Sequence, residues 1–123
     1  MEFLFRAMVS SFRIATEEKK ILSSSQAISI FQNLAGRLDA TPTIKRDFLY
    51  IADRLSLVPP GDLRGKIMSS ISKLFHDLEP IFLSPRRSEI DKSRALNQAI
   101  SSMKKTMKDN VRMPRQNLPG HEM

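Results

Sequence analysis

Apolar side chains recur every three or four residues along most of this chain, which is the spacing of one face of an α-helix. The pattern predicts five helices, over residues 2–21, 25–39, 44–57, 62–79 and 85–112. No stretch shows the strict alternation of apolar and polar residues that marks a half-buried strand. We therefore expect an all-α fold, a small bundle of four to five helices over residues 1–112, with residues 113–123 as a flexible tail.

Residues that cap or interrupt helices separate the apolar segments. Ser23-Ser24-Ser25 supplies hydroxyls for the start of the second helix, and Thr43 can cap the third. Pro59-Pro60-Gly61 is the strongest turn signal, because two prolines donate no backbone hydrogen bonds and glycine permits the turn. Asp62 then serves as the expected N-cap of the fourth helix.

Single residues also bear on where the second, fourth and last helices begin or end. Gly36 lies inside the second apolar face, and we interpret it as a close-packing point rather than a stop. Pro80 is expected to end or kink the fourth helix, because its ring removes a hydrogen bond and clashes with the preceding turn. The last helix begins either at Ser84-Pro85 or at Ser88, which forms a variant of the capping box with Asp91.

The predicted core occupies the centres of the apolar faces. Hydrophobic residues make up 41% of the 123 residues, enough for one core. Leu38 belongs to the apolar face of the second helix, and Leu63 to that of the fourth. The residues expected to be buried are Phe31, Phe48, Ile67, Ile71, Leu74 and Phe75.

The first helix carries more apolar bulk than one buried face requires. Phe3, Leu4, Met8 and Phe12 can face the bundle, which leaves a second apolar strip. That strip consists of Phe5, Val9 and Ile14. Because exposed apolar patches usually mark contacts, we expect self-association there, with a homodimer as the first guess. The alternatives are that a partner protein covers this strip, or that the last helix folds back over it.

Positive charge is concentrated near the C-terminus. The chain has 20 Lys and Arg against 13 Asp and Glu, and residues 84–115 hold nine of these bases but three of these acids. Such a segment can contact phosphates, an acidic protein or an anionic membrane. The macrodipole of a helix C-terminus explains some of these bases without any partner, although not those at the start of the helix. The predicted polyanion-binding residues are Arg86, Arg87, Lys104, Lys105, Lys108, Arg112 and Arg115.

Catalytic and metal-binding patterns are missing from the sequence. There is no cysteine, and the two histidines, His76 and His121, have no ligand set at matched spacing. We expect no enzyme activity, no metal and no cofactor. No recognised DNA- or RNA-binding module is present, and aromatic residues do not interleave with the basic run, so a stacking platform for single strands is not expected.

Targeting signals are also weak. No apolar run approaches the length of a helix that crosses a bilayer, and Arg6 interrupts the apolar start early. We expect a cytoplasmic or nuclear-type compartment, and no secretion. Peripheral membrane contact through Phe3, Leu4, Met8 and Phe12, with Arg6 and Arg13, is a weaker hypothesis.

These observations predict a non-catalytic helical binding module whose basic C-terminal helix contacts a polyanion, with nucleic acid or a nucleoprotein as the partner. The alternative is a protein–protein adaptor or inhibitor that binds through an apolar helix surface. A small helical core with a basic C-terminal third is common among accessory proteins of viruses, phages and secretion systems, an association that assigns no role to any residue.

Overall fold

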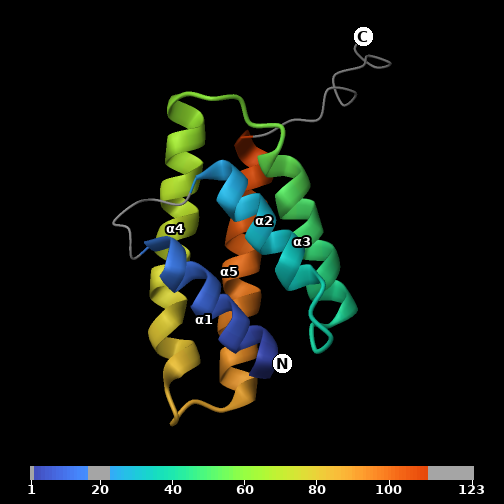
Figure 1. Ribbon diagram of the computed structural model, residues 1–123, viewed down its shortest axis with the longest axis vertical. Coiled ribbons are helices and arrows are strands. Elements are labelled where there is room, and N and C mark those ends of the chain that lie inside the picture. The colour runs from blue at the N-terminus through green and yellow to red at the C-terminus, as the bar shows by residue number, and fades with distance from the viewer. Residues whose placement is uncertain (1, 17–22, 111–123) are drawn as a thin grey trace.

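The computed structural model describes residues 2–16 and 23–110, and these residues form an all-helical bundle without a strand (Figure 1). The predicted all-α fold is confirmed. The five helices are α1 (Glu2–Thr16), α2 (Ser24–Ala35), α3 (Pro42–Leu55), α4 (Asp62–Leu83) and α5 (Glu89–Asn110). The predicted extensions of the first helix to residue 21 and of the last to residue 112, and the predicted tail, lie outside the described residues.

The helices form two layers. In Figure 1, α1 and α2 cross in front of α4, α5 and α3, and α5 lies between the other two. Helix α5 contacts both α3 and α4, α2 packs along α3, and α1 contacts α4 and α2. This arrangement covers one side of α5 and leaves the opposite side to solvent.

Local capping explains where α2, α3 and α5 begin. Ser23 and Gln26 form a capping box, in which the Ser23 hydroxyl accepts from the Gln26 N–H at 3.1 Å. Thr41 caps α3 by accepting from the Ile44 N–H at 3.2 Å, so the prediction of Thr43 was wrong. Pro42 occupies the first turn of α3, where a missing N–H costs nothing. For α5, the Ser88 hydroxyl accepts from the Asp91 N–H at 3.1 Å, which selects the second predicted start.

Two glycines mark helix boundaries, Gly36 contrary to its predicted role and Gly61 in the turn where glycine was expected. Gly36 is the C-cap of α2 and donates its N–H to the Asn33 carbonyl at 3.1 Å, so it is a stop and not an internal packing point. Leu38 therefore lies beyond the helix and is 97% exposed. Gly61 is the N-cap of α4 and has a φ of 140°, a conformation that glycine adopts without strain. The predicted cap, Asp62, is instead the first helical residue.

Pro80 does not end α4, so the predicted end at residue 79 was wrong. The helix continues to Leu83, and the buried Phe82 ring stacks on Phe5 of α1, with ring centroids 4.7 Å apart. Burial of an aromatic ring stabilises by about 1.5–3 kcal/mol, which offsets the hydrogen bond that proline cannot donate. Tertiary packing therefore extends the helix past its local stop signal.

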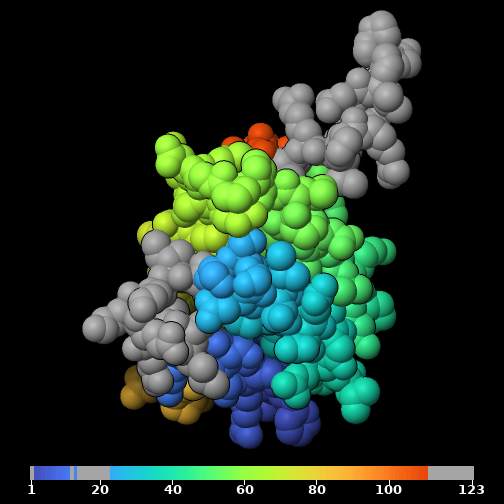
Figure 2. Space-filling model, turned by 45° about the horizontal axis from the view of Figure 1, so that its top comes forward, coloured from blue at the N-terminus to red at the C-terminus, as the bar shows by residue number. Residues whose placement is uncertain are grey.

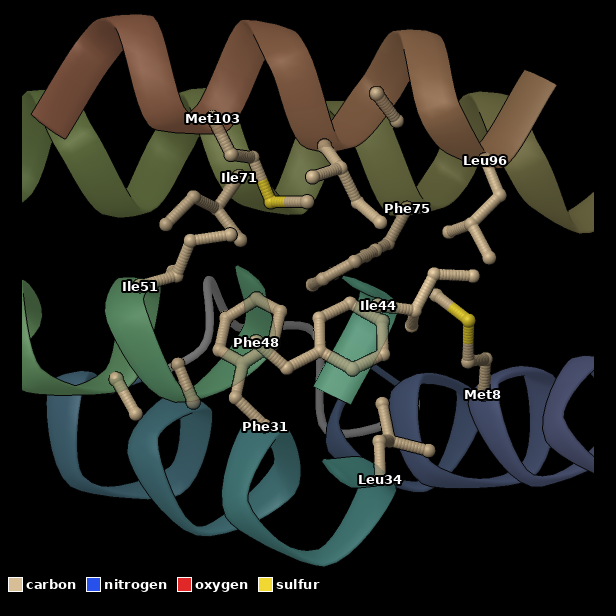
Figure 3. Close-up of a cluster of buried hydrophobic side chains, with 14 of the residues drawn as sticks. Met8, Phe31, Leu34, Ile44, Phe48, Ile51, Ile71, Phe75, Leu96 and Met103 are labelled. Atoms are coloured by element: carbon tan, nitrogen blue, oxygen red, sulfur yellow. The ribbon is translucent and has the colours of Figure 1, made fainter. Parts of the chain in front are cut away.

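The core lies where all five helices meet (Figure 3). Phe31 of α2 lies 5.5 Å from Phe48 of α3 and 5.8 Å from Phe75 of α4, measured between ring centroids. Five of the six predicted core residues are buried, and Leu74 is partly buried. Leu63, which the pattern placed on the apolar face of the fourth helix, is exposed.

Candidate polyanion-binding site

Helix α5 is oriented by its apolar face, which determines where its lysines lie. The buried residues of this face are Leu96, Ala99, Ile100, Met103 and Met107. Because these residues pack against the bundle, Lys105 and Lys108 remain exposed in the last two turns, and Lys104 lies at the margin of the buried face. We call this part of the molecule the lysine end.

Lys104 is held by α3. Its ammonium lies 3.0 Å from the Asp47 carboxylate, with 40% of the lysine side chain and 14% of the aspartate side chain exposed. The same ammonium lies 5.7 Å from the centroid of the Tyr50 ring, and the Arg54 guanidinium lies 4.8 Å from that centroid. Two cations therefore contact one aromatic ring at the junction of α3 and α5.

Tyr50 and Arg54 were missed by the sequence analysis. They lie far from the basic run in the sequence, and packing of α3 against α5 brings them beside Lys104. Tyr50 thus lies near the basic run although no aromatic residue interleaves with it in the sequence. The sequence signal for the contact between Tyr50 and Arg54 was their spacing of four residues, because residues at this spacing are neighbours on a helix.

The other basic residues of this end are more accessible. Lys105 pairs with Asp109 at 3.2 Å, four residues along the helix, and both side chains are mostly exposed. Exposed pairs of this kind contribute about 0.3–0.5 kcal/mol, so a phosphate can readily displace the carboxylate. Lys108 is exposed as well. Arg112 and Arg115 follow in sequence and lie outside the described residues.

Arg86 and Arg87 do not join this cluster. They were expected at the start of the last helix, but they lie exposed in the turn between α4 and α5, where the Arg87 N–H donates to the Ser84 carbonyl at 3.4 Å. The rise of an α-helix places the start of α5 about 22 Å from Lys104. The predicted basic residues are therefore divided between opposite ends of α5.

The strip predicted for self-association is largely part of the core. Phe5 is buried against Phe82, so its expected exposure was wrong. Val9 is partly buried against the same core, and the Ile14 side chain lies outside the described residues. Extension of α4 beyond Pro80 supplies the cover that the sequence pattern left open. The homodimer therefore stays a prediction, and the exposed strip from which it was inferred no longer supports it.

The cavity between α1 and α4 offers no room for a substrate. Its volume is about 10 Å³, no more than a single water molecule needs. Arg13 at its rim pairs with Glu79. Among residues 2–16 and 23–110, no group of three His, Asp or Glu side chains is placed to hold a metal ion. Over the same residues, no helix is long and apolar enough to cross a bilayer.

One carboxylate has a shifted pKa, and it lies away from the lysine end. Burial of Asp39 disfavours its charge, but its Oδ2 accepts hydrogen bonds from the N–H groups of Leu4 (3.2 Å) and Phe3 (2.8 Å). These bonds favour the ionised form and, on balance, hold the pKa of Asp39 below its ordinary value. The carboxylate from the α2–α3 loop thus caps the start of α1.

Comparison with known proteins adds no assignment to this geometry, because no protein-family model, no curated protein and no solved structure matches the chain.

Proposed function

We propose that this protein is a non-catalytic helical binding module whose lysine end contacts a polyanion, with nucleic acid or a nucleoprotein as the partner. The observation that carries this proposal is the charge of one short segment. Residues 104–115 contain five bases (Lys104, Lys105, Lys108, Arg112 and Arg115) and one acid, Asp109. Within the described part of this segment, Lys105 and Lys108 are exposed.

Flexible lysines suit contact with phosphates rather than with bases. Each ammonium is a compact charge on a mobile stem, and neutralising a phosphate releases bound counterions from the nucleic acid. The C-termini of α3 and α5 lie at the same end of the bundle (Figure 1), and helix C-termini carry partial negative charge. Phosphates should therefore lie along the side of α5, beside the lysines, and not over the helix end.

Lys104 has a different part in this proposal from Lys105 and Lys108. Its ion pair with Asp47 must open before the ammonium can contact a phosphate. Tyr50 and Arg54 border the same place, so the surface continues from α5 onto α3. Asp47 therefore limits the affinity of this end for anions, which makes the pair a useful site for a test.

The direct test is the salt dependence of nucleic-acid binding. Fluorescence anisotropy with labelled DNA and RNA of unrelated sequences should show binding that weakens steeply as salt increases. Lys105→Gln with Lys108→Gln should weaken binding to all of them and reduce the slope of log affinity against log salt by about two units. The matched control is Lys73→Gln with Lys92→Gln, in the middle of α4 and near the start of α5, which removes the same charge away from the lysine end.

A second variant should act in the opposite direction. Asp47→Asn releases Lys104 from its ion pair while keeping the shape of the side chain, so affinity should increase by up to about fivefold, the value of a surface ion pair. Absence of binding by the unmodified protein at low salt would overturn the proposal. Equal losses in the Lys105–Lys108 pair and in the control pair would also overturn it, because only overall charge would then matter. The alternative adaptor should instead show a protein partner whose binding barely responds to salt.

A further inference from the structure

The end of the bundle opposite the lysine end exposes large apolar side chains. The start of α1, the α2–α3 loop and the α4–α5 turn lie together at this end (Figure 1), and Figure 2 shows the three segments side by side along the lower edge. Each contributes apolar side chains that face solvent. They are Phe3, Leu38, Leu83 and Ile90, exposed by 69%, 97%, 53% and 70%. We call these four residues the apolar end.

This exposure is unusual for the molecule. The other large apolar side chains that are exposed among the described residues, Leu49, Leu57 and Leu63, are each more than half covered. Single exposed apolar residues are ordinary, but several gathered at one end of a small protein mark a contact surface. The four residues come from α1, the α2–α3 loop, α4 and α5. A rotation of one helix about its axis would therefore not account for their exposure.

The charges beside the apolar end are arginines. Arg37 lies next to Leu38, and Arg86 and Arg87 lie between Leu83 and Ile90, all three exposed. The acids in these segments or directly beside their apolar residues are Glu2, Asp39, Glu89 and Asp91. Glu2 pairs with Arg6 at 2.9 Å, and Asp39 accepts the N–H groups of α1. Asp91 lies 4.0 Å from Arg94, and the N–H groups do not cancel the negative charge of Asp39. The three arginines therefore exceed Asp39 and Glu89 by one positive charge at the apolar end.

We propose that the apolar end docks on an anionic lipid bilayer. Guanidinium groups bind phosphates through paired hydrogen bonds, and apolar side chains beside them can enter the region between headgroups and acyl chains. The four apolar residues protrude from helix ends and turns, and a fluid bilayer accepts such a shape without a matching groove. The membrane contact expected from the sequence shares Phe3 with this surface, but its Leu4 and Met8 are buried.

This proposal does not depend on the polyanion proposal. Helix α5 runs from one end to the other and has 22 residues, which corresponds to a length of about 33 Å. A molecule bound by its apolar end would direct Lys105 and Lys108 away from the lipid. The two activities therefore use different residues and can be tested separately on the full chain.

Flotation with lipid vesicles tests the docking. The unmodified chain should float with phosphatidylcholine vesicles that contain about 30% phosphatidylserine, and much less with phosphatidylcholine alone. Leu38→Ser with Ile90→Ser should reduce binding at least tenfold, with an unchanged melting temperature because both residues are exposed. The matched control, Leu49→Ser with Leu57→Ser on and after α3, should bind like the unmodified chain.

A fluorescent reporter separates insertion from simple charge attraction. The chain contains no tryptophan, so Leu38→Trp creates a single probe at the apolar end. Its emission should shift to the blue on addition of the anionic vesicles, and brominated lipids should quench it. Leu49→Trp is the control and should show neither change. Equal behaviour of both probes would overturn the proposal.

The arginines give a third measurement. Changing Arg37, Arg86 and Arg87 to Gln should weaken binding to the anionic vesicles by about fivefold per residue. Lys105→Gln with Lys108→Gln should leave vesicle binding nearly unchanged, whatever its effect on nucleic acid. No binding to either vesicle would overturn the proposal. A dimer in light scattering that Leu38→Ser with Ile90→Ser dissolves, without vesicle binding, would replace the bilayer by a second copy.

Discussion

The two ends of α5 carry charge of the same sign in different chemical settings. At the lysine end, Lys105 and Lys108 project from the side of a helix, and Lys104 is partly neutralised by Asp47. At the apolar end, Arg86 and Arg87 lie in a turn between the exposed Leu83 and Ile90. The comparison shows that a run of basic residues in a sequence is not one surface. The length of α5 separates its two ends by about three Debye lengths at about 0.1 M salt.

The largest expected effect is a loss of stability that removes the binding activity of both ends. Phe48 is fully buried beside Phe31, and replacing it with alanine should lower the free energy of unfolding by about 3–5 kcal/mol. Because one core supports both ends, vesicle and nucleic-acid binding should be lost together. Urea denaturation measures the stability, with Leu49→Ala, on the exposed side of the same helix, as the control. An unchanged melting temperature for Phe48→Ala would remove this residue from the core.

A smaller loss of stability is expected from a substitution near the apolar end. Asp39→Ala removes the cap of α1, and loss of a helix cap costs about 1 kcal/mol at neutral pH. Because the pKa of Asp39 is lowered on folding, its contribution is fully present above the ordinary pKa of an aspartate, near about 4. The contribution is lost as the pH falls through the folded value.

The measurement is urea denaturation of both proteins at neutral pH and again in strong acid. The difference between them should shrink on acidification, while the exposed control Asp53→Ala should differ little from the unmodified chain at either pH. A difference of the same size at both pH values would contradict the role of the ionised carboxylate.

The smallest expected effect separates the two ends most sharply. Arg86→Gln with Arg87→Gln should leave the affinity of the lysine end for nucleic acid within about twofold at about 0.15 M salt. The distance of about 22 Å exceeds the Debye length of about 8 Å, so the charges are screened from the bound phosphates. Anisotropy titrations should be run beside Lys105→Gln with Lys108→Gln. Equal losses in the two pairs would mean that all seven predicted residues act as one surface.

Gly36 and Pro80 depart from their predicted roles for the same physical reason. Gly36 was interpreted as a packing point because the apolar spacing continues to Leu38, and the spacing does not show that the chain must turn to bring Asp39 to α1. Local rules predict that Pro80 ends or kinks the helix, but they do not include the stacking of Phe82 on Phe5. In both places a contact between distant segments outweighed a local preference.

The candidate site could be predicted in part from the sequence. Lys105 and Lys108 could be assigned to the exposed side of α5, because the helical period divides a helix into an apolar and a polar face. Tyr50 and Arg54 could not be assigned to Lys104, because no periodicity within one helix tells which other helix packs beside it.

The five helices, most of the buried residues and the excess of positive charge toward the C-terminus could be predicted from the sequence. These properties follow from local spacing, capping chemistry and composition, which each segment carries with it. Only the packing of the helices explains that Phe5 is covered, that the basic residues divide between two ends, and that the segments carrying Phe3, Leu38, Leu83 and Ile90 lie at one of them. Those outcomes depend on how helices distant in sequence cross one another, because burial and proximity are properties of the packed chain.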